Sequence, residues 1–394
     1  MSKNYGKTLR ACYLGFITQA ICANFIPLLF LKFHNDYSIP LGKIALISTT
    51  FFFTQLIVDF LCTYLADRIG YRICIVTSEV CAALGLIGLA FLPDLFADPF
   101  VGILIAVVIY AIGSGLIEVL ISPIVEACPT ERKEAAMTLL HSFYCWGQAI
   151  VITVSTAFFV VFGVSAWRYM SFAWAVLPLV NIVMFSLVPI NTLGGENKPA
   201  PIRDILRNPT FWILAVMMTA AGASEIAMCQ WASAFTESGL GVTKTVGDIA
   251  GPCAFALLAG SARLIYAKFS TKINLVNFMG LSCALCTLSY LLSALSPNPV
   301  LALFGCALCG FSSGVLWPGI FSIAPRLCPS SGVAVFALLA LAGDLGCAIG
   351  PATIGFVSDI FGGDLHIGML AAAVFPFIGF LALITLKAKE KKVI

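Results

Sequence analysis

The sequence predicts an all-α integral membrane protein, and three observations lead to that fold class. Hydrophobic residue types make up 60% of the 394 residues and charged types only 10%, whereas soluble domains average roughly 25% charged residues. Apolar runs of helical length recur along the whole chain, and one polar stretch divides them into two groups. So few charges exclude a soluble enzyme, a disordered chain and a nucleic-acid-binding protein, and the net charge of +3 does not indicate a polyanionic partner.

The apolar runs predict twelve spanning helices, since one span needs roughly 20 apolar residues. Glycines and prolines at about 191–209 break regular structure between the sixth and seventh runs. We therefore expect an N-terminal six-helix bundle (1–190), a cytoplasmic linker (191–209) and a C-terminal six-helix bundle (210–394). Residues 202–206 fit either a short amphipathic surface helix or a flexible linker. The twelve expected spans are about 11–31, 43–66, 73–93, 100–127, 135–163, 167–189, 210–233, 246–266, 274–294, 298–323, 332–357 and 366–387.

The distribution of basic residues predicts the orientation of the chain. With the N-terminus in the cytoplasm, eighteen of the 22 Lys and Arg residues fall on the cytoplasmic side. The four on the other side are Lys32, Lys43, Arg168 and Lys244. Because basic residues are concentrated in cytoplasmic loops, we expect a multi-pass protein of the cell membrane with both termini in the cytoplasm.

The fifteen cysteines include two pairs with zinc-site spacing, Cys283-x2-Cys286 and Cys306-x2-Cys309. Both pairs fall inside apolar runs that we expect to span the membrane, so small buried thiols are the better interpretation. The sequence therefore predicts no metal and no disulfide framework. We also expect no cofactor and no catalytic residues.

A charged loop follows the second predicted span and reads Leu65-Ala66-Asp67-Arg68-Ile69-Gly70-Tyr71-Arg72. The loop resembles the conserved Gly-x-Leu-Ala-Asp-Arg-x-Gly-Arg-Lys loop of the major facilitator superfamily, with Thr63 in place of the leading glycine. A weaker echo, with Gly260, Arg263 and Lys268, lies at the matching place in the second half. The alternative interpretation is a charged turn that obeys the positive-inside rule.

The resemblance implies the major facilitator fold, which consists of two pseudo-symmetric six-helix bundles. It also implies that the charged loop and its echo latch one conformation. We expect Asp59, two helical turns before Asp67, to belong to the same network. The gating residues implied in this way are Asp59, Asp67, Arg68, Gly70, Arg72, Arg263 and Lys268.

Segments of later spans are similar to the fucose-permease-like branch of the superfamily, which contains fucose, galactose and glucose proton symporters. The segments are Gly113–Glu118, Ser122-Pro123, Leu139–Tyr144 with Gly147, Trp317–Ile323 and Gly343–Pro351. The chain departs from this branch at Asn24, where an Asn-Asp pair is typical. The fourth span also lacks the arginine of many proton-coupled members.

Acidic residues inside the predicted spans are the main functional candidates, because a charged side chain at the bilayer centre costs roughly 2.5–3.5 kcal/mol. Asp59, Glu118, Glu225 and Asp344 fall on spans that border the cavity in the superfamily, while Glu79 lies close to the cytoplasmic end of the third span. We expect Glu118 and His141 to carry the coupling proton. A neutral Glu118 hydrogen-bonded to a neighbouring helix is the alternative.

Polar and aromatic groups on the cavity spans form the predicted substrate site, and the mixture suits a polar, uncharged solute. No arginine is expected in the middle of a cavity span, which disfavours phosphorylated or strongly anionic substrates. For Glu225, substrate contact and a structural hydrogen bond are equally open. The predicted substrate-binding residues are Gln19, Asn24, Tyr144, Trp146, Gln148, Glu225, Gln230, Trp231, Trp317 and Asp344.

The sequence therefore predicts a monomeric secondary active transporter with a small-molecule substrate, protons and the lipid bilayer as partners. The leading hypothesis is proton-coupled symport of a sugar-like molecule by alternating access. The alternative is proton-driven efflux of drug-like molecules, although the fifth span lacks the glycine-proline signature of such exporters. Nothing in the sequence supports a receptor or a membrane enzyme.

Overall fold

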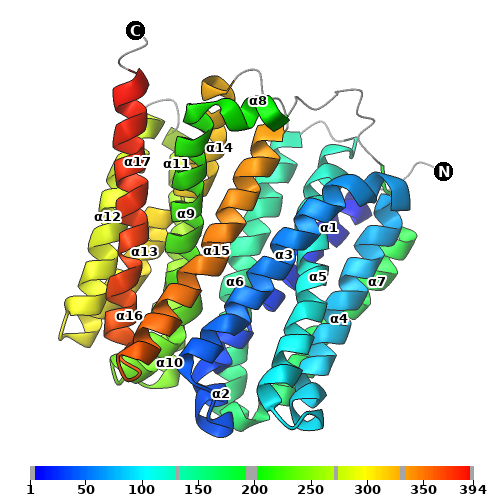
Figure 1. Cartoon of the computed structure of the whole chain (residues 1–394). Helices are drawn as coiled ribbons and strands as arrows, with labels where there is room; N and C mark the ends of the chain where they lie inside the picture. Colours follow the sequence, from blue (N-terminus) through cyan, green and yellow to red (C-terminus); the bar gives the residue numbers. More distant parts are fainter. Residues whose placement is uncertain (1–4, 130–132, 192–201, 270–273, 329–333, 391–394) are drawn as a thin grey trace. The chain divides into compact units, whose positions relative to one another are not determined.

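The structure is a computed structural model that describes residues 5–129, 133–191, 202–269, 274–328 and 334–390 (Figure 1). Within these ranges all regular structure is helical. Twelve stretches of the described residues are long and apolar enough to cross a membrane. The predicted fold class, an all-α protein with twelve spanning helices, is confirmed.

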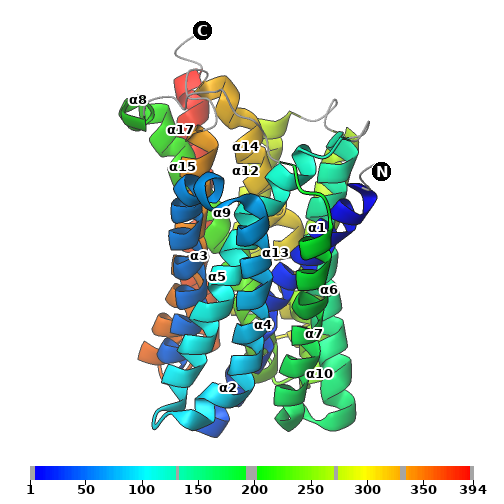
Figure 2. The ribbon, with the colours of Figure 1, turned by 90° about the vertical axis from the view of Figure 1, so that its right-hand side faces the viewer.

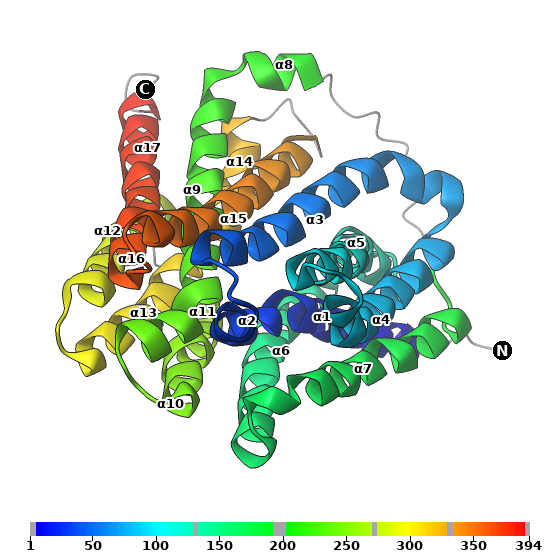
Figure 3. The same cartoon turned by 60° about the horizontal axis from the view of Figure 1, so that its bottom comes forward.

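The chain divides into two compact units, and the N-terminal unit comprises Met1–Ile39 and Thr50–Gly195. Helices α4 and α5 pack side by side along their length (Figure 2, Figure 3), and α1 packs against α5, α6 and α7. The helices of this part of the chain are α1 (Tyr5–Asn24), α2 (Phe30–Tyr37), α3 (Leu41–Ile69), α4 (Tyr71–Leu95), α5 (Pro99–Glu126), α6 (Lys133–Phe162) and α7 (Trp167–Leu187).

The C-terminal unit comprises Glu196–Ile394 together with Pro40–Thr49, the start of α3. Its long helix α9 packs against α15 and α17, and α12 packs against α13. Of the predicted linker, residues 192–201 lie outside the described residues. The helices are α8 (Ile202–Arg207), α9 (Pro209–Ala234), α10 (Lys244–Asp248), α11 (Ala254–Phe269), α12 (Leu275–Leu295), α13 (Pro299–Ser313), α14 (Leu316–Leu327), α15 (Ala334–Ile360), α16 (Leu365–Ala372) and α17 (Val374–Glu390).

Three helices begin with the same local signal, a capping side chain followed by proline. Asp98, Asn208 and Asn298 each accept a hydrogen bond from the backbone N–H two residues later. Proline follows each of them as the first helical residue. The cap satisfies one of the free N–H groups at the helix start, and proline has no N–H to leave unpaired. These pairs therefore fix where α5, α9 and α13 begin.

Several spans lose regular α geometry partway. The first span passes through a 3-10 turn at Ile26–Leu29, which contains Pro27. The seventh ends in a π-helical turn at Phe235–Gly239, and the tenth is interrupted at Gly314 and Val315, between α13 and α14. Interrupted helices at corresponding places in two halves are typical of the spans that form transporter binding sites.

Glycines allow α9 and α15 to pack closely. A Cβ atom added at Gly350 would lie 2.5 Å from the Ala223 carbonyl oxygen and 2.9 Å from the Ala223 Cα. Because lipid tails are as apolar as the side chains, spanning helices associate through close packing and polar contacts rather than through the hydrophobic effect. Gly350 is therefore one of the glycines that allow the close approach of α9 and α15.

We expect Gly350→Ala to lower the thermal unfolding midpoint of the detergent-solubilised protein, because the new methyl group meets backbone rather than a movable side chain. Overpacking of this kind costs about 1–3 kcal/mol. Gly379→Ala is the matched control, since its added Cβ would lie 3.4 Å from the Ala220 Cβ, an ordinary contact. Equal midpoints for the two variants would contradict this packing argument.

His366 links three segments at one end of the C-terminal unit. Its Nδ1 lies 2.9 Å from the Ala294 carbonyl oxygen, and its Nε2 lies 2.9 Å from the Gly239 carbonyl oxygen. Both partners are acceptors, so a ring nitrogen that carries hydrogen donates to the carbonyl oxygen that faces it. The Phe235 ring packs edge-on against the imidazole at 5.1 Å.

We expect His366→Leu to destabilise the protein by about 1–3 kcal/mol, because two carbonyl groups at helix ends lose their donor. His366→Gln keeps an amide that can donate to one of them, so its thermal midpoint should lie between those of His366→Leu and the wild type. A His366→Leu midpoint equal to that of the wild type would show that neither bond contributes to stability.

Candidate functional site

Glu118 on α5 is the centre of a polar cluster in the N-terminal unit. Gln19 on α1 donates its Nε2–H to the Glu118 Oε2 at 2.9 Å, and the Gln55 amide on α3 donates to the same oxygen. Ser114, one turn before Glu118 on α5, donates to the Gln55 Oε1 at 3.4 Å, which orients the Gln55 amide. One carboxyl group therefore connects α1, α3 and α5.

Asp59 belongs to the same cluster. A carboxylate oxygen of Asp59 lies within 4.8 Å of one of Glu118. Gly115 leaves room for the aspartate, since a Cβ at Gly115 would lie 3.2 Å from the Asp59 Oδ1. Two carboxylates this close in an apolar environment repel each other when both are ionised, so the pair favours holding one proton. We call Gln19, Gln55, Asp59, Ser114 and Glu118 the acid centre.

The sequence analysis did not single out Gln55, and it grouped Asp59 with the charged loop at 65–72. Gln55 and Asp59 are four residues apart on α3, so they lie on one face of the helix. Two polar residues at this spacing within an apolar run are a signal that could have identified the cluster. The structure brings Asp59 to Glu118, and its predicted gating role stays a prediction.

The other residues of the charged loop take no part in the acid centre. Gly70 precedes α4 with a φ of 99°, a conformation that favours glycine. Arg72 donates to the carbonyl oxygens of Phe185 and Ser186 at 2.8 Å and of Val188 at 2.7 Å. These carbonyls lie at the end of α7, where a cation is favourable. Arg68 is exposed.

Three predicted residues cannot be placed at the level of side chains. Asp67 lies in α3, His141 in α6 and Lys268 in α11, and the side chains of all three are outside the described part of the structure. The predicted pairing of His141 with Glu118 therefore stays a prediction.

In the C-terminal unit, Glu225 on α9 pairs with Arg263 on α11. The Glu225 Oε1 lies 3.1 Å from the Arg263 Nη2. The Arg263 Nε also donates to the Gly314 carbonyl oxygen at 2.9 Å, at the interruption between α13 and α14. The arginine therefore connects three spans, and its positive charge offsets the half-buried carboxylate.

This ion pair adds to one expectation from the sequence. We expected no arginine in the middle of a cavity span, and Arg263 lies near the end of the span Lys244–Tyr266. Its side chain nonetheless reaches Glu225, in the middle of the span Pro209–Gly239. A guanidinium group is therefore present at that depth, and it is paired with a carboxylate.

The predicted amide and tryptophan residues differ in their surroundings. Gln230 accepts a hydrogen bond from Ser48 at 2.7 Å, and Trp231 is fully buried, donating to the Pro351 carbonyl oxygen at 2.9 Å. Both contacts are internal to the C-terminal unit. Asn24 donates to the Ala20 carbonyl oxygen of its own helix. Trp231 is therefore a packing residue here rather than an open aromatic surface.

The remaining predicted substrate residues are less uniform in burial. Trp146 on α6 is 43% exposed and stacks edge-on with Phe143, and Tyr144 is half-buried. Gln148 and Asp344 are buried. Trp317 packs edge-on against Phe321 and directly against Gly343. Among the predicted residues, hydrogen bonds or ion pairs join Gln19 to Glu118 and Glu225 to Arg263.

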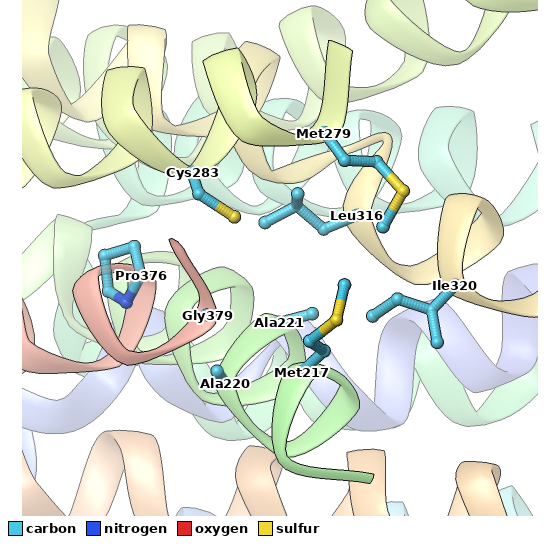
Figure 4. Close-up of a pocket in the computed structure, with 9 residues that line it drawn as sticks. All are labelled: Met217, Ala220, Ala221, Met279, Cys283, Leu316, Ile320, Pro376 and Gly379. Atoms are coloured by element: carbon cyan, nitrogen blue, oxygen red, sulfur yellow. The ribbon is translucent and has the colours of Figure 1, made fainter. Parts of the chain in front are cut away.

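A small apolar cavity of about 10 Å³ lies inside the C-terminal unit (Figure 4). It is bounded by α9, α12, α14 and α17, and it contains none of the predicted substrate residues. A polar solute would lose its hydrogen bonds to water there without gaining new ones. The lining residues are Met217, Ala220, Ala221, Met279, Cys283, Leu316, Ile320, Pro376 and Gly379.

We expect either single substitution of the ion pair, Glu225→Gln or Arg263→Gln, to destabilise the protein, since each leaves a half-buried charged partner alone. Breaking a fully buried pair costs about 3–5 kcal/mol, so we expect a smaller loss for this half-buried pair. The double variant Glu225→Gln/Arg263→Gln removes both charges and should be more stable than either single variant. Thermal unfolding in detergent measures all three, and strictly additive losses would contradict the pairing.

Comparison with known proteins agrees with the fold. Residues 11–351 match the family model of the Major Facilitator Superfamily. A bacterial homologue of the human lysosomal transporter Spinster has a TM-score of 0.80 at 16% identity, with 98% of each chain covered. The nucleoside transporter NupG has a TM-score of 0.79 at 12% identity, covering 96% of this chain and 99% of its own.

The D-xylose-proton symporter is a further structural neighbour, with a TM-score of 0.72 at 14% identity and 96% of each chain covered. No curated protein sequence matches the chain. At these identities the neighbours show the fold alone, whereas the family model covers most of the chain. The protein is a multi-pass membrane transporter rather than an enzyme, and it belongs to the major facilitator superfamily.

Proposed function

We propose that this transporter couples the movement of a sugar-like polar small molecule to the movement of protons, and that Glu118 carries the proton. The observation that carries the proposal is the acid centre, in which the Glu118 carboxyl accepts two amide N–H groups beside a second carboxyl, Asp59. Alternating access between the two six-helix halves is the transport mode expected of this fold.

The hydrogen bonds of Glu118 suggest how a proton would change the N-terminal unit. Two donated N–H groups favour the ionised carboxyl, while burial in an apolar bundle favours the neutral one. A proton on Oε2 turns that oxygen into a donor, so the Gln19 and Gln55 amides can no longer both donate to it. Because Gln19 lies on α1 and Gln55 on α3, protonation of Glu118 would be felt by two other helices.

The substrate class is proposed from the polar groups of the bundle and from two structural neighbours. Gln19, Tyr144 and Gln148 offer amide and hydroxyl groups, which suit the hydroxyl groups of a sugar. Two neighbours are named as a nucleoside transporter and a D-xylose-proton symporter, and both solutes bear sugar hydroxyls. The resemblance to the fucose-permease-like branch, the cell-membrane location and cytoplasmic termini are parts of the same proposal.

Transport in proteoliposomes with an imposed pH gradient tests the function. We expect an inward proton gradient to drive accumulation of at least one radiolabelled sugar or nucleoside. Glu118→Gln, which resembles the permanently protonated carboxyl, should abolish gradient-driven accumulation and keep exchange of labelled for unlabelled solute. Asp204→Asn is the control, because Asp204 is exposed on α8, outside the predicted spans.

Three outcomes would overturn parts of the proposal. Wild-type transport that is insensitive to the gradient would remove proton coupling. Full gradient-driven accumulation by Glu118→Gln would show that another residue carries the proton. Gradient-driven loss of solute from loaded vesicles would replace symport with proton-driven efflux.

A further inference from the structure

Gln55, which donates to Glu118 from α3, has a second partner that can reverse its role. Gln55 is buried and uses both ends of its amide. Its Nε2 donates to the Glu118 Oε2, and its Oε1 accepts a hydrogen bond from the Ser114 hydroxyl at 3.4 Å. Ser114 is fully buried and lies one turn before Glu118 on α5. Serine, glutamine and glutamate therefore form a chain of two hydrogen bonds in which each donor points toward the carboxyl.

This direction of the hydrogen bonds fits the ionised carboxyl. A carboxylate only accepts, whereas a protonated carboxyl has an O–H group that needs an acceptor. A half-turn of the Gln55 amide about its last side-chain bond, a torsion with two comparable orientations, supplies that acceptor. The amide oxygen then faces Glu118 and the NH2 group faces Ser114. Since a serine hydroxyl accepts as well as donates, both hydrogen bonds form again in the opposite direction.

The carboxyl group of Glu79 on α4 shows why the hydroxyl matters. Glu79 is fully buried, although we expected its helix to face lipid, and Thr18 on α1 hydrogen-bonds its carboxyl. Asn181 on α7 donates through Nδ2 to the Glu79 Oε1 at 2.6 Å and to the Ala11 carbonyl oxygen at 3.1 Å. Turning the Asn181 amide would place its oxygen against that of Ala11, two acceptors without a hydrogen between them. A hydroxyl as the second partner is what allows the Gln55 amide to turn.

We propose that Gln55 and Ser114 are positioning residues of the proton site, and that the Gln55 amide reverses when Glu118 gains or loses its proton. The pair gives a donor to the ionised carboxyl and an acceptor to the protonated one. Neither charge state then leaves a buried polar group of the pair unpaired, which would cost about 1–3 kcal/mol. The inference rests on the proposed role of Glu118, and it explains how the proton is accommodated.

Substitution of the two residues should shift the titration of Glu118 in opposite directions. Gln55→Leu removes a charge-assisted hydrogen bond, which is stronger than its neutral counterpart, so the ionised form loses more and Glu118 keeps its proton to higher pH. Ser114→Ala leaves the N–H of the reversed amide without an acceptor, so the protonated form loses more and Glu118 releases its proton at lower pH. A purely structural role would not produce opposite shifts.

Infrared titration of the purified, detergent-solubilised full-length protein measures these shifts. The protonated-carboxyl band that is lost in Glu118→Gln belongs to Glu118. We expect its midpoint to move by about one pH unit in each variant, upward in Gln55→Leu and downward in Ser114→Ala. Ser78→Ala is the matched control, because Ser78 is a fully buried serine whose hydroxyl donates to the Ile75 carbonyl oxygen of its own helix. Its midpoint should equal that of the wild type.

A further comparison separates the amide from neighbouring titratable groups. Within the N-terminal unit, Asp59 on α3 lies beside Glu118, and His141 on α6 has its side chain outside the described part of the structure. A charge on either residue acts on both orientations of the amide. We therefore expect the opposite shifts of the Gln55 and Ser114 variants to persist in an Asp59→Asn background and in a His141→Gln background.

Each outcome has a distinct meaning. Unchanged midpoints in both variants, or shifts in the same direction, would overturn the proposal. A wild-type protein without a Glu118 band would overturn both this proposal and the assignment of the proton to Glu118. Opposite shifts in a protein whose transport is insensitive to a pH gradient would support the reversing amide and overturn proton coupling alone.

Discussion

The absence of water from the bilayer core is the constraint on which the polar structure of this protein depends. A charge or hydrogen-bonding group in a span must find its partner within the protein, because lipid offers none. The chain responds differently in each unit. In the N-terminal unit, carboxyl groups accept amide hydrogens from Gln19, Gln55 and Asn181. In the C-terminal unit, Glu225 is paired with a full positive charge, Arg263.

This difference affects how each unit can use its acid. Glu225 next to a guanidinium is stabilised in its ionised form, because loss of its charge would leave Arg263 alone. Glu118 accepts hydrogen bonds from two neutral amides and lies near a second carboxyl, so it can gain or lose a proton without leaving a buried counter-charge behind in these contacts. The same constraint therefore favours a structural role for Glu225 and a titrating role for Glu118.

The spans and the functionally important acids could be predicted from the sequence because placing either kind of residue in a bilayer involves a large free-energy change. Twenty apolar residues identify a span almost without regard to context, and an acid within such a run is costly wherever it lies. The partners could not be predicted in this way. The sequence does not distinguish Gln55 from other polar residues, because its contact with Glu118 depends on α3 lying beside α5. Arg263 lies near the end of an apolar run, at a position that a loop residue could also occupy. Glu79 shows the same limit, since composition does not tell which face of a helix is buried.

Helix α1 connects the two carboxyl clusters of the N-terminal unit. Thr18 and Gln19 are consecutive, so they point about 100° apart around the helix, the first toward Glu79 and the second toward Glu118. A helix moves as a rigid element over so short a distance, and a rotation that improves one contact changes the other. If protonation of Glu118 and protonation of Glu79 each favour a different orientation of α1, the two protons must influence each other's affinity by the same factor. The spacing of two adjacent side chains is thus sufficient to link the clusters without any direct contact between the two carboxyl groups.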